Sequence, residues 1–273
     1  MGSKDDLLRW PQARSASGLS TSWLTLARKA VRHPQRALLR LVLWARLRRT
    51  TLEESRARAL DAISARWGVD ATELANEYRG SEIARWYQEQ LAALQGILGQ
   101  GRMGTSDRFG CELLYVVVRA ARPQVAVETG VLYGASSGHI LAAMEANGQG
   151  ELHSIDLGTC PGEPPYHFLV RPDLMARWHY VVGDIRTELP QVLGRLGQID
   201  MFYHDSLHTF EHMTWEYETA ARHLRPGGVL ASHDVITAES ILGIFRDNAF
   251  PAFCRRHSLN AVMARNTGIA EWL

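Results

Sequence analysis

The sequence has little of several features that would place it in a special class of protein. Its 273 residues include only three cysteines, Cys111, Cys160 and Cys254, which stand far apart and form no C-x-x-C pair. That spacing argues against a zinc finger and against a disulfide framework, and it favours a reducing environment. The first residues lack the pattern of a secretory signal, so we expect a cytoplasmic protein.

Long apolar runs and a strong net charge are also missing. The uncharged run from Leu41 to Ala45 is far too short for a membrane-spanning helix. The formal net charge of +1 gives no reason to expect a nucleic-acid partner. Charge is uneven, however, because residues 1–60 carry 13 Lys or Arg and four Asp or Glu, which leaves a net charge of −8 for the remainder. The basic character therefore belongs to the N-terminal part alone.

The chain has enough apolar material for one large core. Hydrophobic residues make up 46% of the sequence, and one domain of about 170 residues with an extension is the natural division of this length. We assign residues 1–100 to a basic, helical extension and residues 101–273 to the main domain. The glycines Gly99, Gly101 and Gly104 form the predicted linker between them.

The extension is predicted to consist of amphipathic helices. Residues 22–49 mix Leu, Val and Trp with Arg and are interrupted at Pro34, which predicts two helices, and residues 51–100 predict three more. The arginine-rich faces could contact acidic lipid at a membrane surface. The alternative is that the apolar faces pack on the main domain or on a second subunit. We favour packing, because amphipathic helices mostly face protein cores, and we expect a homo-oligomer.

The main domain alternates predicted strands with predicted helices. In its central stretch, an apolar strand ends on Glu128, a turn carries Gly130 and Gly134, and a second strand after a helix ends on Asp156. The order predicts a three-layer α/β sandwich with a mostly parallel, seven-stranded, Rossmann-like sheet. The predicted strands are Val125–Val127, Glu151–Ile155, His179–Val182, Ile199–Tyr203, Val229–Ser232, Ala261–Ala264 and Gly268–Trp272.

The turn after the first strand is a candidate nucleoside site. Glycines there let the backbone approach a ligand closely, and amides at the start of the next helix can donate to its polar end. Asp156 follows at a spacing that suits a ribose diol. Gly130 and Gly134 are four residues apart with no glycine at position 132, which disfavours the G-x-G-x-x-G fingerprint of dinucleotide enzymes.

Together with Gly183 and Asp184 after the third strand, these features resemble a class I S-adenosylmethionine-dependent methyltransferase over roughly residues 100–273. The resemblance implies S-adenosylmethionine as the cofactor. The residues implied to bind it are Glu128, Thr129, Gly130, Gly134, Ser136, Asp156 and Asp184.

The resemblance also implies roles for these residues. Glu128 would accept from the cofactor ammonium group or from nearby amides, Asp156 would hold the ribose hydroxyls, and Asp184 would reach the adenine amino group. The alternative for Asp184 is an N-cap of the helix that begins near Ile185. Ser136 is a helix-start donor, available to the cofactor carboxylate or to no ligand at all.

A second polar group follows the fourth and fifth strands. The stretches YHDSLHTFEH from Tyr203 and LRPGGVLASHD from Leu224 resemble bacterial small-molecule O-methyltransferases of the sugar- and antibiotic-methylating type. Asp205 and Asp234 stand at the carboxyl ends of neighbouring strands, so both carboxylates should face one crevice. Two hard oxygen ligands there suit Mg²⁺, with the third ligand and the need for a metal left open.

His208 is the candidate general base, working beside Asp205. An imidazole titrates near neutral pH and can accept the proton of a substrate hydroxyl. His204, His212 and His233 lie in the same region, so the base could be one of them. Some of these histidines could also serve only to bond loop carbonyls or to hold Asp205.

The resemblance implies an O-methyltransferase that acts on a hydroxyl of a small molecule, such as a sugar or another product of secondary metabolism. One alternative is an NAD(P)-dependent oxidoreductase on the same layered sheet, which the glycine spacing and the Asp205, His208 and Asp234 group disfavour. The other is a non-catalytic, methyltransferase-like scaffold tethered by its basic N-terminal helices.

Overall fold

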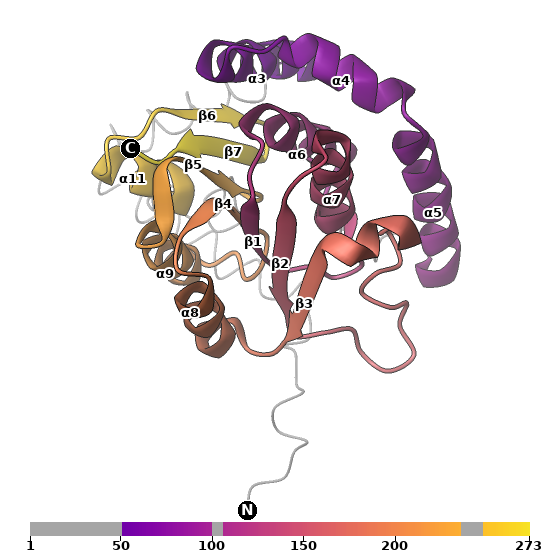
Figure 1. The fold of residues 1–273 in the computed structure, drawn as a ribbon. Coiled ribbons are helices and arrows are strands. Elements are labelled where there is room, and N and C mark those ends of the chain that lie inside the picture. Colours follow the sequence, from indigo (N-terminus) through magenta and orange to yellow (C-terminus); the bar gives the residue numbers. More distant parts are fainter. Residues whose placement is uncertain (1–50, 100–105, 236–247) are drawn as a thin grey trace, which may run out of the picture. The chain divides into compact units, whose positions relative to one another are not determined.

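The computed structural model describes residues 51–99, 106–235 and 248–273. Its centre is a seven-stranded sheet with the strand order β3-β2-β1-β4-β5-β7-β6 (Figure 1). Strands β1 to β5 are parallel, and β7 is antiparallel to both of its neighbours. The strands are β1 (Val125–Thr129), β2 (Glu151–Asp156), β3 (Trp178–Val182), β4 (Ile199–His204), β5 (Leu224–Ser232), β6 (Ala261–Ala264) and β7 (Thr267–Glu271). The predicted fold class is confirmed.

Successive residues of the strands feed two separate hydrophobic cores. Ala126 and Leu152 pack on one face, whereas Val127 and Ile155 pack on the other. Val127 is one residue after Ala126 and Ile155 is three after Leu152, and side chains an odd number of residues apart on a strand point to opposite faces. The central strands are apolar on both sides because helices cover both faces. Helices α6 (Arg108–Ala121) and α7 (Ala135–Asn147) cover one face, and α8 (Ile185–Leu196), α9 (Phe210–Ala221) and α11 (Ala249–Arg256) cover the other (Figure 1).

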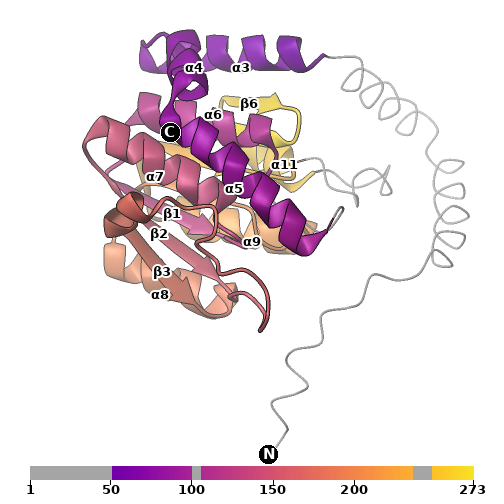
Figure 2. The ribbon, with the colours of Figure 1, turned by 90° about the vertical axis from the view of Figure 1, so that its right-hand side faces the viewer.

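Three further helices lie outside α6 and α7, as Figures 1 and 2 show. They are α3 (Leu52–Trp67), α4 (Ala71–Gly80) and α5 (Glu82–Leu98), and they match the three helices predicted for residues 51–100. Each begins on a residue whose side chain accepts from the first turn: Thr51, Asp70 and Ser81. Such caps satisfy amides that have no partner inside the helix.

Several predictions lie outside the described residues. They are the two helices between residues 22 and 49 with their membrane-surface alternative, the linker glycines Gly101 and Gly104, and the boundary at residue 100. Within the three described ranges, no helix is both long and apolar enough to cross a membrane.

A buried carboxylate ties the outer helices α3 and α4 to α6. Glu112 of α6 accepts a hydrogen bond from Arg56 of α3 at 3.1 Å and two from Arg79 of α4 at 3.1 and 2.8 Å. Two guanidinium partners offset the free-energy cost of burying this charge.

Replacing Glu112 with Gln should lower the free energy of unfolding by about 2 kcal/mol or more, because the charge-assisted bonds to two arginines are lost while the amide stays buried. Urea unfolding followed by circular dichroism measures the change. The matched control is Glu53→Gln, which removes a 3.0 Å ion pair with the same Arg56 at an exposed position and should change stability by less than about 0.5 kcal/mol. Equal effects of the two substitutions would mean that Glu112 does not hold the helices.

Candidate active site

The predicted site residues converge where the strand order reverses. From β1 the chain builds β2 and β3 on one side of the sheet and then crosses to build β4 and β5 on the other. Ligands of open α/β sheets bind at the carboxyl ends of the strands beside such a switch point. Here the backbone amide of Asp205, just after β4, donates to the carbonyl of Thr129, the last residue of β1, at 2.8 Å. The two predicted groups therefore meet at one point.

The glycine turn fits against the end of β4 only because position 130 has no side chain. Gly130 has a φ of +84°, and a Cβ there would lie 2.1 Å from the carbonyl oxygen of Asp205. Gly134 has a φ of +85°, and its Cβ would lie 2.6 Å from Val170. Both positions require glycine for backbone conformation and for space.

Asp156 holds the same turn from the other side. One oxygen of its carboxylate accepts from the amides of Val131 at 2.7 Å and Leu132 at 3.2 Å, and the other accepts from the amide of Gly158 at 2.7 Å. A carboxylate has about four acceptor positions, so one remains for a ligand hydroxyl. Asp156 therefore fixes the shape of the turn, and its contact with a ribose stays a prediction.

Glu128 lies on β1, two residues before Gly130. It is fully buried, and its carboxylate accepts from the hydroxyls of Ser136 at 2.5 Å, Ser137 at 2.6 Å and Ser154 at 2.7 Å. Burial raises the pKa of Glu128 to about 7, against the opposing effect of the three hydroxyl donors. The side chains of Glu128 and Ser136 thus bond to each other and join β1 to β2 and α7.

Thr129 belongs to a second buried network, centred on Glu216 of α9. The Glu216 carboxylate accepts from Thr129 Oγ1 and Ser206 Oγ, each at 2.5 Å, and lies 2.7 Å from His204 Nδ1 and from His212 Nε2. Burial works to raise the pKa of Glu216, but the interactions with His204 outweigh it and hold the pKa well below its usual range. The ends of β1 and β4 are thereby joined through one ionised carboxylate.

Asp205, His208 and Asp234 form the predicted cluster beyond the ends of β4 and β5. His208 Nε2 lies 3.3 Å from Asp205 Oδ1, and His208 Nδ1 lies 3.0 Å from Asp234 Oδ2. Burial works to lower the pKa of His208, but the two carboxylates raise it to about 9. The pKa of Asp205 falls to about 2, and that of Asp234 falls further, because their histidine partners outweigh burial. At neutral pH, His208 is an imidazolium between two carboxylates.

The donor set of this cluster fits a divalent cation. One ligand atom from each of the three residues lies within 4.8 Å of the other two, so a single ion can contact all of them. Two carboxylate oxygens are the ligands that Mg²⁺ prefers in proteins. An imidazolium cannot be a metal ligand, so ion binding at this place requires loss of the proton from His208 or movement of its ring.

Residues 127–235 match a family model described as a methyltransferase domain. The matched range contains the site residues named so far, from Glu128 to Asp234. The chain carries a methyltransferase domain of the class I, S-adenosylmethionine-dependent fold. No curated protein matches it by sequence.

Solved structures share the fold of this methyltransferase domain at low identity. A methyltransferase from Geobacter sulfurreducens is 18% identical with a TM-score of 0.51, over 68% of this chain and 88% of that one. An O-methyltransferase from Bacillus cereus in complex with SAH is 13% identical with a TM-score of 0.51, over 73% and 96%. A putative caffeoyl-CoA O-methyltransferase from Staphylococcus aureus is 13% identical with a TM-score of 0.52, over 74% and 99%.

At the outer end of the methyltransferase crevice, Asp184 follows β3. Its side chain accepts from the amide of Arg186 at 2.9 Å and caps α8. The capping role weighed for Asp184 is therefore present in the structure, and its carboxylate remains exposed at the same edge of the sheet as Asp156. Contact with an adenine stays a prediction.

Sequence reasoning missed three residues of the site. Ser106 donates to Asp205 Oδ2 at 2.6 Å from 99 residues away, and no local pattern marks it. Asn266, in the turn between β6 and β7, donates from Nδ2 to Asp234 Oδ1. Glu216 did leave a signal, because it stands four residues after His212 on a predicted helix and so shares its face.

His233, which sequence reasoning left among several histidines, is a second cation beside the aspartates. Its Nδ1 lies 3.4 Å from Asp205 Oδ1 and 3.7 Å from Asp234 Oδ2. Burial works to lower the pKa of His233, but hydrogen bonds with Asp107 and Asp205 raise it to about 12. His233 is 8% exposed. It therefore contributes to the site by lowering the pKa of Asp205 from a buried position.

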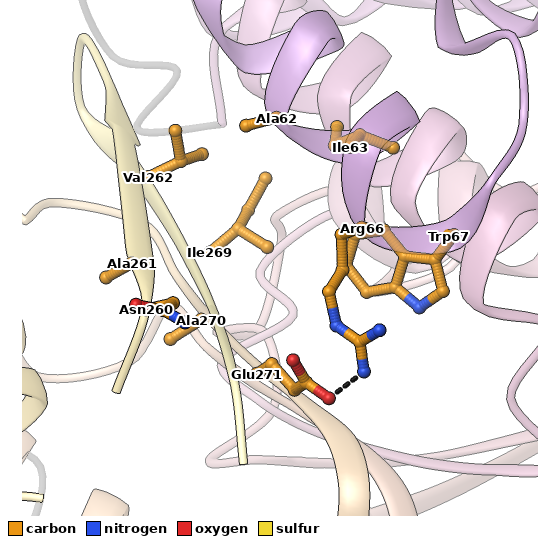
Figure 3. A pocket seen from close by; sticks show the side chains of 10 residues that line it. All are labelled: Ala62, Ile63, Arg66, Trp67, Asn260, Ala261, Val262, Ile269, Ala270 and Glu271. Carbon is orange, nitrogen blue, oxygen red and sulfur yellow. Dashed lines mark ion pairs between the residues drawn. The ribbon is translucent and has the colours of Figure 1, made fainter. Parts of the chain in front are cut away.

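A separate cavity of about 210 Å³ lies between α3 and the β6–β7 hairpin (Figure 3). Apolar side chains such as Ile63, Val262 and Ile269 line it, together with the ion pair of Arg66 and Glu271. It contains none of the predicted site residues. We therefore assign the chemistry to the crevice at β1 and β4 and not to this cavity.

Gly130→Ala should destabilise the methyltransferase domain by about 3 kcal/mol or more, because a strained φ adds to a clash that only backbone movement relieves. Gly148→Ala is the matched control, since Gly148 has a φ of +67° and no atom within 4 Å of an added Cβ. It should cost only about 1–2 kcal/mol. Urea unfolding compares the two, and similar losses would show that the turn can move away from β4.

Glu128→Gln should alter how stability depends on pH. The unfolded carboxyl ionises near its ordinary value of 4.5 and the folded one near 7, so the wild type should lose roughly 3 kcal/mol relative to the variant as the pH rises from about 5 to 8. Below about pH 4.5 this difference should be constant. Unfolding free energies measured across that range test it, and parallel curves would contradict a raised pKa for Glu128.

Proposed function

We propose that this methyltransferase is an O-methyltransferase that acts on a hydroxyl group of a small molecule. The observation that carries the proposal is the contact between the glycine turn at Gly130 and the strand end at Asp205. It brings a nucleoside-type turn and a cluster of acid and base groups to one crevice. A methyl donor and a hydroxyl acceptor need such an adjacency to react.

S-adenosylmethionine fits the wall of this crevice that is built by the glycine turn. Gly130 and Gly134 give the turn its shape, Asp156 keeps an acceptor position for a ribose hydroxyl, and Asp184 presents an exposed carboxylate after the neighbouring strand β3. The B. cereus enzyme of the same fold contains SAH, which is the product formed from this donor. We assign Glu128, Thr129 and Ser136 a structural role in this region. The hydroxyl of Ser136 donates to Glu128, and the hydroxyl of Thr129 donates to Glu216.

Methyl transfer from a sulfonium ion depends mainly on alignment, because the leaving group is already good. The acceptor hydroxyl must still lose a proton, and His208 is the group placed to take it. While His208 is held protonated by Asp205 and Asp234, it cannot serve as a base. When these aspartates pair with another cation, His208 loses the two interactions that raise its pKa and can accept a proton.

Mg²⁺ is the cation that best suits Asp205 and Asp234. Bound there, it would lower the pKa of a substrate hydroxyl and orient it. We extend the proposal to sugar or other secondary-metabolite hydroxyls, to a cytoplasmic homo-oligomer and to an extension over residues 1–100, and these parts rest on the sequence patterns alone.

Titration calorimetry with S-adenosylhomocysteine (SAH), with and without Mg²⁺ and with NAD as the comparison ligand, tests the cofactor. We expect micromolar binding of SAH and none of NAD. Binding of NAD alone would assign an oxidoreductase. Failure of a folded protein to bind either ligand would favour the non-catalytic scaffold.

Two variants should separate binding from chemistry. Asp156→Ala should weaken SAH binding at least about 100-fold, because a ribose partner and the anchor of the turn are both lost, whereas the exposed control Asp61→Ala should leave it unchanged. His208→Gln should keep SAH affinity within about twofold and slow turnover by about 10²-fold or more. SAH release with a panel of small hydroxyl compounds measures turnover. The reverse pattern would exchange the two roles.

A further inference from the structure

A second cluster of metal-binding side chains lies at the opposite edge of the sheet from the crevice. Glu151 is the first residue of β2 and His153 stands two residues later, so their side chains project from the same face of the strand. In the parallel register of β2 and β3, His179 is the direct partner of His153. The pairing of the two strands therefore places both imidazoles and the carboxylate side by side.

The distances within this cluster are those of a metal coordination shell. His153 Nε2 lies 3.0 Å from Glu151 Oε1, and His179 Nε2 lies 3.2 Å from Glu151 Oε2. Ligand atoms bound tetrahedrally at about 2.0–2.1 Å from zinc lie about 3.3 Å apart. One ligand atom from each residue lies within 4.8 Å of the other two, so small rotations of the side chains can enclose one ion.

The two imidazole rings are stacked, with centroids 4.5 Å apart and an angle of 13° between their planes. Both rings direct Nε2 toward the same carboxylate. An ion from solvent can reach the site, because the side chains of Glu151 and His179 are 44% and 51% exposed. His153 is 15% exposed and gives the site a fixed inner ligand.

This cluster is independent of the methyltransferase crevice. Glu151 stands at the start of β2 and Asp156 at its end, about 17 Å away along the strand. The crevice residues named above include none of the three side chains. Their partners here are one another, so the methyl-transfer proposal gives them no task.

We propose that Glu151, His153 and His179 form a zinc site that fastens the edge strand β3 to β2. Two imidazoles and one carboxylate suit Zn²⁺, whereas Mg²⁺ favours oxygen ligands. Three protein ligands leave a fourth position for water. Among the described residues β3 is an edge strand and pairs only with β2. A metal bridge between the two strands would therefore restrain β3 further.

Equilibrium dialysis of the full chain against Zn²⁺, with metal measured by mass spectrometry, tests the site. Because the Asp205, His208 and Asp234 cluster can also bind zinc, the measurement uses the Asp234→Asn background. We expect one equivalent of bound zinc there, and His179→Gln in that background should weaken its binding at least about 100-fold, since loss of even an outer partner of a ligand costs 10–100-fold. His153→Gln should do the same.

His257→Gln is the matched control, because His257 faces a single carboxylate, Glu218, at 3.4 Å. It should leave zinc binding unchanged. Zinc should also raise the melting temperature of the Asp234→Asn protein but not that of the protein that carries both Asp234→Asn and His179→Gln. Equal zinc affinity with and without His179→Gln in a folded Asp234→Asn protein would overturn the proposal. Absence of the zinc equivalent from the Asp234→Asn protein would also overturn it.

Discussion

The close packing of the glycine turn against the end of β4 is the constraint on which the rest of the crevice depends. The carbonyl of Asp205 occupies the space that a side chain at position 130 would need. This contact fixes how far apart the ends of β1 and β4 lie, and so it fixes the distance between the turn and the Asp205, His208 and Asp234 cluster. The hydrogen bonds from the turn to Asp156 and the network around Glu216 hold the same junction from its two sides.

The buried carboxylates at this junction show how partners, more than burial, decide the state of a charge. Glu128 and Glu216 are both fully buried. Glu128 faces three neutral hydroxyls and its pKa is raised to about 7, whereas Glu216 faces histidines and its pKa is lowered. At Glu128 the hydroxyl donors offset only part of the effect of burial on the pKa, whereas at Glu216 the interactions with His204, His212 and Ser206 together outweigh it. The junction of β1 and β4 thus holds one buried carboxyl whose pKa is raised to about 7 and a second, Glu216, whose pKa is lowered.

The charge of His208 connects this electrostatic arrangement to the proposed chemistry. Its two aspartates make it a cation, and a cation between two carboxylates occupies the place that a metal ion would take. Proton and metal therefore compete for one position. In the proposed mechanism, His208 can act as a general base only after Asp205 and Asp234 have paired with another cation.

Sequence alone determined the elements and their order. Apolar runs, turn glycines and capping residues are local signals, so the seven strands could be predicted closely and only their ends differed, as where β5 begins at Leu224 instead of Val229. The meeting of Asp205 with Asp234 could also be predicted, because parallel neighbouring strands end at one edge.

Tertiary structure alone decided which acceptors and donors are already paired. Ser106 donates a hydrogen bond to Asp205, 99 residues away in sequence, and three serine hydroxyls donate to Glu128. The pairing register of β2 and β3 places His179 beside His153. Hydrogen-bond partners and pKa values depend on distances of a few ångströms between segments remote in sequence, and no local pattern carries those distances.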